Sequence, residues 1–311
     1  MNGVPLLALL VVSGLWGGHA VVGKAVETHL SVFPLTIWRF TLCAVCYLPF
    51  YNRLFRIFRL PRRAFYRLLI CGLCWAVLYP LFYYESLLYL TPVAALLLVN
   101  TSPLLAAVIG QLFFRERISL WGWIGIVVSF MGVLLLIVGG PLRASFVGII
   151  LAFIASAAFA LYSVLSRPLF QSLPLVDVLT STSIFGVVIL WIIAIFSGQA
   201  KSVVIALHGL DFTGWVGLLY IVLFVSTIAY VFYGFGLRRV PSGIASAITF
   251  YPQVPIAAVI QWIWLGIVPA PSLATSAALI LAGTALMSRK QKKRSVRQEG
   301  AAELLFEHED G

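Results

Sequence analysis

Long apolar stretches, each about the length of one membrane crossing, follow one another along the chain. Ten can be drawn, at 4–24, 31–52, 67–89, 92–113, 120–140, 146–166, 174–197, 212–236, 241–264 and 270–288. A helix needs about 20 apolar residues to cross a hydrocarbon core about 30 Å thick, whereas the strands of a membrane barrel alternate polar and apolar residues. The pattern therefore predicts an all-α integral membrane protein with ten transmembrane helices.

The composition agrees with this pattern. Of the 311 residues, 62% are hydrophobic and 10% are charged, and the mean hydropathy is +1.05. A water-soluble domain of this size has too little interior to bury so much apolar surface. The first stretch has no basic segment of the signal-peptide kind and leads directly into further stretches, so we expect a retained helix.

Basic residues mark one side of the predicted bundle. Of the 21 Lys and Arg, 17 follow even-numbered stretches or lie in the tail. They are Arg53, Arg56, Arg59, Arg62, Arg63, Arg67, Arg115, Arg117, Arg167, Arg238, Arg239, Arg289, Lys290, Lys292, Lys293, Arg294 and Arg297. Because positive residues favour the cytoplasmic side, we expect a multi-pass protein of the cell inner (plasma) membrane with both termini in the cytoplasm. The net charge of +11 then reflects topology, and no nucleic-acid partner is implied.

The last segment, 289–311, changes from basic to acidic and contains few residues that could form a core. We expect it to be a disordered cytoplasmic tail. Its basic half marks the topology, and the alternative role for that half is contact with anionic membrane lipids.

Two parts of the chain repeat the same order of residues. The aligned pairs are Pro92 and Pro241, Tyr84 and Tyr233, Asn100 and Thr249, Pro103 and Pro252, and, nearer the start of each part, Trp16 and Phe159, His19 and Tyr162, and Lys24 and Arg167. These pairs predict two five-helix repeats, 1–140 and 141–288. Because five is odd, the second repeat enters the membrane upside down. Inverted repeats are typical of secondary transporters, whose substrate site lies near the midplane between the halves.

Pro103 and Pro252 fall near the middle of the fourth and ninth stretches. A proline offers no N–H to the carbonyl four residues earlier, which costs about 3 kcal/mol in a helix interior. The freed carbonyls belong to Val99 and Ile248, and such groups are tolerated at membrane depth only beside protein, polar side chains or a watery cavity. We expect paired kinks that shape a cavity and act as hinges; the alternative is a pair of packing kinks.

Short motifs in a fixed order resemble the EamA-type drug/metabolite transporter superfamily. They are LWG (15–17), WRF (38–40), the proline of the fourth stretch and FFRERIS (113–119). The resemblance covers about residues 3–288, and it implies ten helices in two inverted five-helix repeats around a central cavity. Glu116, in the last motif, has no acidic counterpart after the ninth stretch. This departure removes a loop feature and leaves the presumed cavity untouched.

Two titratable residues are candidates for proton coupling. Glu85 is the only carboxylate clearly within a stretch, and a buried carboxylate suits reversible protonation. It could instead be the counter-ion of a cationic substrate, form a salt bridge to Arg39, or lie exposed at the interface. His19 lies near mid-depth, where it could titrate, donate to a substrate carboxylate, or stay neutral and bond a backbone carbonyl.

Aromatic and polar side chains recur on the helices that the resemblance places at the cavity. Their rings could stack on a flat apolar solute or hold a cation, and the alternative is core packing together with the interfacial aromatic belt. As a set they describe an amphipathic pocket. The predicted substrate-binding residues are Trp16, His19, Tyr79, Tyr83, Asn100, Tyr162, Tyr230, Tyr233, Thr249 and Tyr251, with Trp75 and Phe250 on the same helices.

Arg39 is costly in lipid and should face inward or extend to the interface. We expect a structural pair within the bundle, with substrate binding as the alternative. The pairs Cys43/Cys46 and Cys71/Cys74 have the spacing of zinc ligands, but four thiolates would bury negative charge in hydrocarbon without polar surroundings. Free cysteine also behaves as a small hydrophobe, so no metal is expected.

These features predict a secondary-active transporter that moves a small amphipathic metabolite, such as an amino acid, organic cation or drug-like solute, by alternating access. The resemblance favours efflux, and proton coupling is an additional hypothesis. The alternative is an importer or facilitator of a vitamin-, nucleoside- or choline-like solute. The sequence contains no G-x-x-x-x-G-K-[ST], HExxH or GxSxG motif, so we expect no cofactor and no enzyme activity. The competing classes are a membrane enzyme and a non-transporting scaffold; a transporter is expected to act as a monomer.

Overall fold

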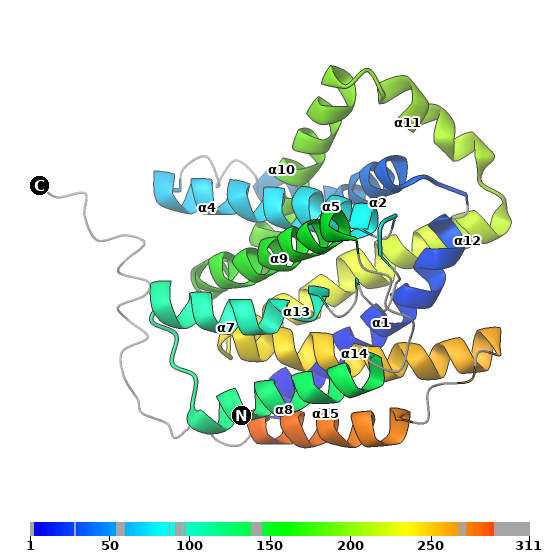
Figure 1. The fold of residues 1–311 in the computed structure, drawn as a ribbon. Helices are drawn as coiled ribbons and strands as arrows, with labels where there is room; N and C mark the ends of the chain where they lie inside the picture. The colour runs from blue at the N-terminus through cyan, green and yellow to red at the C-terminus, as the bar shows by residue number, and fades with distance from the viewer. Residues whose placement is uncertain are drawn as a thin grey trace, which may run out of the picture.

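The computed structural model describes residues 3–27, 29–53, 60–86, 88–90, 95, 98–137, 145–266, 268 and 272–288. Within these residues the chain forms helices joined by short connections, with no strand (Figure 1). The helices are α1 (Gly3–Glu27), α2 (Val32–Cys46), η1 (Leu48–Arg53), α4 (Arg62–Gly72), η2 (Leu73–Leu78), α5 (Tyr79–Ser86), α7 (Ser102–Phe113), α8 (Leu120–Ile137), α9 (Phe146–Ser172), α10 (Leu175–Phe196), α11 (Ala200–Ala206), η3 (Leu207–Gly209), α12 (Phe212–Tyr220), η4 (Ile221–Ile228), α13 (Ala229–Leu237), α14 (Ser242–Leu265) and α15 (Leu273–Ser288). The predicted tail, 289–311, and Pro92 lie outside the described residues.

Several helices are long and apolar enough to cross a membrane. Among the described residues these are Arg62–Ser86, Phe146–Ser172, Leu175–Phe196, Phe212–Leu237 and Ser242–Trp264. Shorter apolar helices, such as Val32–Cys46 and Leu120–Leu135, correspond to other predicted stretches. The expectation of an all-helical chain with several membrane-crossing helices is therefore confirmed at this level.

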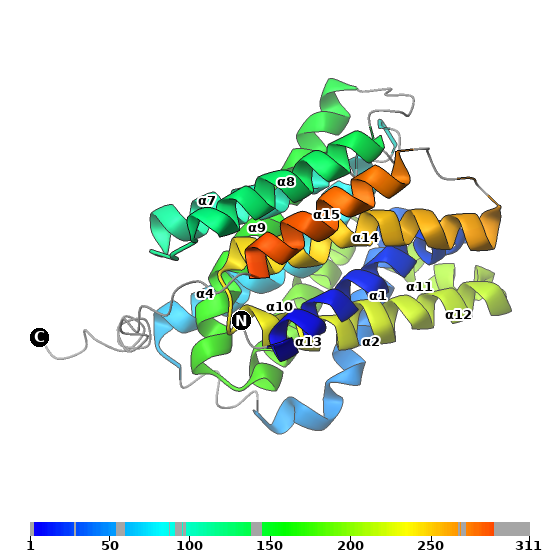
Figure 2. The ribbon, with the colours of Figure 1, turned by 90° about the horizontal axis from the view of Figure 1, so that it is seen from below.

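Helices from the beginning and the end of the chain pack against one another. The most extensive contacts join α8 to α15, α1 to α14, α7 to α14, α5 to α9, α1 to α13 and α7 to α9. Each of these pairs combines a helix before residue 138 with one after residue 145. Figures 1 and 2 show the start of α1, the start of α14 and the end of α15 at one end of the bundle.

Small residues allow the closest of these crossings. A Cβ atom added at Gly125 on α8 would lie 2.5 Å from the carbonyl oxygen of Gly283 on α15. One added at Gly243 on α14 would lie 2.4 Å from the Cβ of Ala107 on α7. Because association in lipid depends on close packing, glycine at these two crossings lets the backbones approach as no larger residue would.

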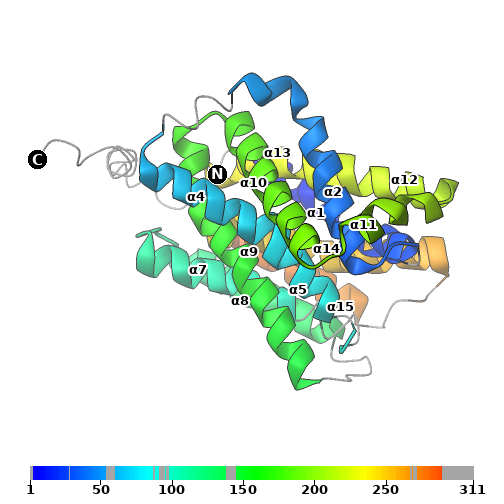
Figure 3. The same cartoon turned by 90° about the horizontal axis from the view of Figure 1, so that it is seen from above.

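Two of the long helices contain a π-helical section near the middle. In Arg62–Ser86 it is η2, and in Phe212–Leu237 it is η4. Figure 3 shows the first of these helices running beside α9 and α10, which contact it along its length. A π-helical section widens the turn and loosens the regular hydrogen-bond ladder, and such sections are frequent at functional sites.

The fourth predicted stretch, 92–113, differs from the expected single kinked helix. α7 begins at Ser102, and Asn100 and Thr101 lie in a turn directly before it. Pro103 therefore occupies the first turn of α7, where its missing N–H leaves no helical hydrogen bond unmade. Pro252, in contrast, lies inside the continuous helix α14. The two prolines that the sequence aligns thus stand in different local structures.

Candidate functional site

Eight aromatic side chains meet at the centre of the described structure, and we call them the central aromatic cluster. Its members are Trp16 from α1, Trp75 from η2, Tyr79 from α5, Phe159 and Tyr162 from α9, Tyr230 and Tyr233 from α13, and Phe250 from α14. The Trp16 ring lies 5.4 to 5.7 Å, centroid to centroid, from four other rings of the cluster. Helices from both parts of the chain therefore share one aromatic centre.

The cluster is tightly packed and carries polar groups. Phe159 and Phe250 have centroids 4.6 Å apart, and Trp75 and Tyr230 have centroids 4.7 Å apart. The hydroxyl of Tyr162 is buried and forms no hydrogen bond with the described residues. Because a buried polar group without a partner is costly, this hydroxyl requires an explanation beyond packing.

The structure brings together half of the predicted substrate-binding residues. Trp16, Tyr79, Tyr162, Tyr230 and Tyr233 all belong to the central aromatic cluster. Phe159 was visible in the sequence only as the counterpart of Trp16, and the two rings prove to be in direct contact at 5.7 Å. The alignment of Phe159 with Trp16 was therefore the sequence signal that could have placed Phe159 among the candidate site residues.

The other predicted residues lie around or away from the cluster. Tyr83 stacks on Tyr79 at 6.1 Å with an interplanar angle of 7°. Asn100 is buried at the turn before α7, and Thr249 is buried with its hydroxyl donating to carbonyls of its own helix. Tyr251 instead packs against Phe130 of α8, at 6.2 Å. Tyr251 is thus separated from the rings with which it was grouped.

A buried polar chain, which we call the Arg39 chain, runs beside the cluster through Arg39, Tyr84, His19 and Ser226. The Arg39 Nε donates to Ser226 Oγ at 2.7 Å, and its Nη1 donates to the Tyr84 hydroxyl at 3.3 Å. The Tyr84 hydroxyl is also 3.1 Å from His19 Nε2. Arg39 is only 4% exposed, so the expected inward orientation is present.

Glu85 does not take part in the salt bridge considered from the sequence. It lies in the last turn of α5 and is partly buried. Within the described part of the chain, the ion pairs join His29 to Asp211 and Arg167 to Glu116, and neither includes Glu85 or Arg39. The structural partners of Arg39 are therefore hydroxyl groups and the ring of Phe40, over which its guanidinium lies at 5.2 Å.

Side chains of α1, of α2 and of Tyr47, directly after α2, donate hydrogen bonds to the backbone of η4. The carbonyls of Val225, Ser226 and Thr227 accept from Trp16 Nε1 at 3.3 Å, Cys43 Sγ at 3.4 Å and the Tyr47 hydroxyl at 3.4 Å. Buried carbonyls need partners, and in the widened π-helical turn these side chains supply them. Cys43 thus has a local role as a hydrogen-bond donor, and the described residues contain no group of three or more His, Cys, Asp or Glu that could hold a metal.

Serines from α1 and α9 support the two proline regions. Pro252 leaves the Ile248 carbonyl without its helical donor, and Ser13 Oγ donates to that carbonyl at 2.8 Å. Before Pro103, the Thr101 hydroxyl donates to the Leu98 carbonyl at 2.6 Å and is 2.8 Å from Ser156 Oγ. Ser13 and Ser156 each come three residues before an aromatic residue of the aligned pair Trp16 and Phe159. This shared spacing is the feature of the sequence that could have identified the two serines.

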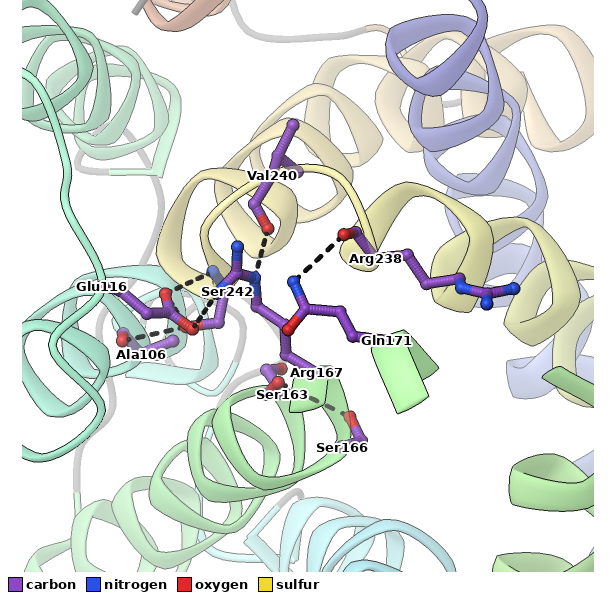
Figure 4. Close-up of polar contacts among 9 residues, drawn as sticks. All are labelled: Ala106, Glu116, Ser163, Ser166, Arg167, Gln171, Arg238, Val240 and Ser242. Atoms are coloured by element: carbon purple, nitrogen blue, oxygen red, sulfur yellow. Dashed lines mark hydrogen bonds and ion pairs between the residues drawn. The ribbon is translucent and has the colours of Figure 1, made fainter. Parts of the chain in front are cut away.

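A second polar group, the Glu116 network, joins three segments at one end of the bundle (Figure 4). Glu116 Oε2 accepts from the backbone N–H of Ser242 at 2.7 Å and from its hydroxyl at 2.8 Å. Glu116 Oε1 is 3.4 Å from Arg167 Nη1, and Arg167 Nε donates to the Val240 carbonyl at 2.9 Å. A carboxylate at the start of α14 satisfies an open N–H and interacts favourably with the helix dipole.

Comparison with known proteins identifies the family. The model of the EamA-like transporter family matches residues 3–138 and 146–289. A solved crystal structure superposes on 93% of this chain and 97% of its own with a TM-score of 0.73, at 19% sequence identity. At that identity the likeness concerns the fold alone.

Relatives from Bacillus subtilis (strain 168) bear the names of transporters. Uncharacterized transporter YyaM is 24% identical over 183 residues, which are 57% of this chain and 58% of that protein. Uncharacterized transporter YetK is 24% identical over 261 residues, which are 82% of this chain and 77% of that protein. Uncharacterized transporter YdfC, with 25% identity, is matched over 55% of its length, so this chain spans less than two thirds of YyaM and YdfC.

The family match extends over most of the chain and includes every helix that forms the central aromatic cluster and the Glu116 network. The described helices are those of a multi-pass membrane protein, and the names of the relatives are those of transporters and not of enzymes. The chain therefore belongs to the EamA-like transporter family.

Proposed function

We propose that this transporter is a secondary-active exporter of a small amphipathic solute, which binds at the central aromatic cluster and crosses the inner membrane by alternating access. The observation that carries the proposal is a buried aromatic centre beside a buried polar chain, in which the Tyr162 hydroxyl forms no hydrogen bond with the described residues. Binding sites for small molecules combine mostly apolar walls with a few placed polar groups. A solute with a flat apolar body and one polar end fits this combination.

The packing of the helices supports two inverted repeats, 1–140 and 141–288. If α1 corresponds to α9 and α14 to α7, the contact of α1 with α14 has its counterpart in the contact of α9 with α7. Likewise, the contact of α1 with α13 has its counterpart in that of α9 with α5. The π-helices η2 and η4 then stand in corresponding helices. Alternating access follows if the two repeats exchange their conformations around the shared centre.

The Glu116 network is the candidate for a closed gate at the cytoplasmic end. We assign that end from the basic residues that follow the even-numbered stretches, among them Arg115, Arg117, Arg238 and Arg239. The network connects the segment after α7 with α9 and with the start of α14. Loading of a solute from the cytoplasm would require these contacts to separate, and their re-formation would close that side.

We assign coupling to protons to Glu85 or His19. Glu85 is next in sequence to Tyr84, whose hydroxyl contacts His19. A titratable group beside a solute site can exchange its proton for the solute, which is the requirement for antiport. The alternative of an importer or facilitator uses the same residues, and only the imposed gradients distinguish the two.

The test begins with a thermal-shift screen of the purified protein against amino acids, organic acids, polyamines, quaternary amines and nucleosides. Compounds that stabilise the protein are then measured by counterflow in proteoliposomes, with and without a pH gradient. Uptake above that of empty liposomes, lost in Trp16→Ala and kept in the control Trp121→Ala, whose side chain is exposed, supports the proposal. Absence of counterflow for every stabilising compound contradicts it, and equal rates in both variants contradict the central site.

A further inference from the structure

We propose that the Arg39 chain binds the carboxylate group of the transported solute, so that the substrate class is a carboxylate-bearing molecule with an aromatic or apolar body. This inference rests on the proposed function. It concerns Arg39, Tyr84 and His19, whose side chains come from α2, α5 and α1.

The first argument is the charge of Arg39. Its side chain is buried to 96%, since only 4% is exposed, yet its hydrogen bonds go to the neutral hydroxyls of Ser226 and Tyr84. No carboxylate of the described residues forms an ion pair with it. A buried guanidinium with neutral partners carries a desolvation cost that an anion would offset, and carboxylates are the groups that arginine binds most specifically.

The second argument is the position of the chain relative to the central aromatic cluster. Trp16 precedes His19 by three residues on α1, and Tyr230 follows Ser226 by four residues on a continuous helix. Residues three and four apart in a helix lie on the same face. Each polar residue thus stands one turn from an aromatic member of the cluster. If the carboxylate of a solute binds Arg39, the apolar body of that solute lies beside those rings.

The third argument is the capacity of the hydroxyl groups to accept a new ligand. The Tyr84 oxygen accepts a bond from Arg39, and the same hydroxyl contacts His19. Ser226 Oγ likewise accepts from Arg39 and has a proton to donate. A carboxylate could therefore receive bonds from the Arg39 guanidinium and from the Ser226 hydroxyl. An ammonium group would meet a buried positive charge instead.

The experiment uses the full-length purified protein and three probes of similar shape: 3-phenylpropionate, its amide 3-phenylpropanamide, and phenethylamine. Thermal shift measures binding, and counterflow in proteoliposomes measures transport. We expect 3-phenylpropionate to bind about tenfold or more tightly than the amide, because the amide lacks a charge-assisted bond. Phenethylamine should bind most weakly.

The variants are Arg39→Gln and Arg39→Lys, with Arg239→Gln as the control. Arg239 is exposed, and its guanidinium lies over the ring of Phe235 at 4.0 Å. Arg39→Gln should abolish the preference for the carboxylate over the amide, Arg39→Lys should keep part of it, and Arg239→Gln should keep it whole. If Arg39→Gln does not fold, the comparison of the three probes on the natural protein still decides the question.

The outcomes separate this inference from the proposed function. Counterflow of phenethylamine without binding of 3-phenylpropionate would leave the transporter standing and overturn the carboxylate site. Equal affinity for the acid and its amide, or an unchanged preference in Arg39→Gln, would also overturn it. A protein that shows no counterflow for these probes or for any compound of the wider screen would refute the proposed function itself.

Discussion

Glu116 and Arg39, two buried charged residues of the described part of the chain, have partners of different kinds. Glu116, 5% exposed, accepts hydrogen bonds from Ser242 and pairs with Arg167. Arg39, 4% exposed, is held by hydroxyl groups. A carboxylate that is fully bonded stabilises the closed arrangement it belongs to, whereas a guanidinium with neutral partners is suited to a ligand of opposite charge.

Removing the Glu116 carboxylate should destabilise the described conformation. In Glu116→Ala the Ser242 N–H and the Arg167 guanidinium both lose a buried partner, which costs about 2 kcal/mol. We expect a lower melting temperature for the purified protein. We also expect greater reactivity of a thiol introduced at Ser242 towards water-soluble reagents, because the end of the bundle opens more often.

The matched control for this change is Asp211→Asn. Asp211 also caps a helix, since its Oδ1 accepts from the Gly214 N–H at 2.7 Å at the start of α12. Asparagine caps helices about as well as aspartate, and the exposed pair of Asp211 with His29 contributes little to stability, so this variant should melt as the natural protein does. An unchanged melting temperature and thiol reactivity in Glu116→Ala would mean that the network has no part in holding the end closed.

Glu85 and His19 are the two candidates for proton coupling, and a substitution of Glu85 distinguishes them. Glu85→Gln keeps the size of the side chain and removes its ability to exchange a proton. Expression should be preserved, while the dependence of counterflow on a pH gradient should disappear. A variant that retains the full response to the gradient would exclude Glu85 as the coupling residue and direct attention to His19.

At the scale of elements, hydrogen bonds between helices compensate the breaks within them. The Ile248 carbonyl, freed by Pro252, accepts from Ser13 on α1, and the η4 carbonyls accept from α1 and α2. Such bonds cross between the early and the late parts of the chain. If the early part of the chain moves relative to the late part, these hydrogen bonds either break and are replaced or keep the bonded helices together during the movement.

A double-mutant cycle tests the role of Ser13. Ser13→Ala alone leaves the Ile248 carbonyl without a partner and should cost about 1 to 2 kcal/mol of stability. Pro252→Ala restores an N–H at the position that normally bonds this carbonyl. In the double variant the loss of Ser13 should therefore cost much less, and thermal melting of all four proteins measures the coupling. Additive effects would show that the serine and the proline are unrelated.

The sequence predicted some elements and could not predict others. Apolar stretches were sufficient to anticipate the helices Arg62–Ser86 and Phe212–Leu237, because twenty apolar residues leave few alternatives in lipid. The π-helices inside them have no signature in composition, since they arise from one extra residue accommodated in a turn. The alignment of Pro103 with Pro252 predicted equal kinks. Because α7 begins at Ser102, Pro103 lies in the first turn of its helix and does not correspond to Pro252, which lies inside one.

The same limit applies to the site. The sequence grouped Trp16, Tyr79 and Tyr230 as aromatic residues on expected cavity helices, and the structure brings their rings into one cluster. Tyr251, next to Phe250 in sequence, faces α8 instead. Successive residues on a helix point in directions about 100° apart, which follows from about 3.6 residues per turn. Only the packed structure fixes which of two neighbours faces the centre.

At the scale of the whole molecule, helices of the early and late parts of the chain alternate around one centre. This arrangement gives both parts a share in the central aromatic cluster and in the Glu116 network. We propose that the end of the bundle at the Glu116 network opens and closes during each transport cycle.

Reversible cross-linking tests this claim most directly. Cysteines replace Glu116 and Ser242 in a protein whose four native cysteines have been substituted, and a short cleavable thiol reagent joins them. Counterflow should stop in the cross-linked protein and return after cleavage, while each single-cysteine variant should show the same flux after the treatment as before it. Undiminished counterflow in the fully cross-linked protein would contradict the account.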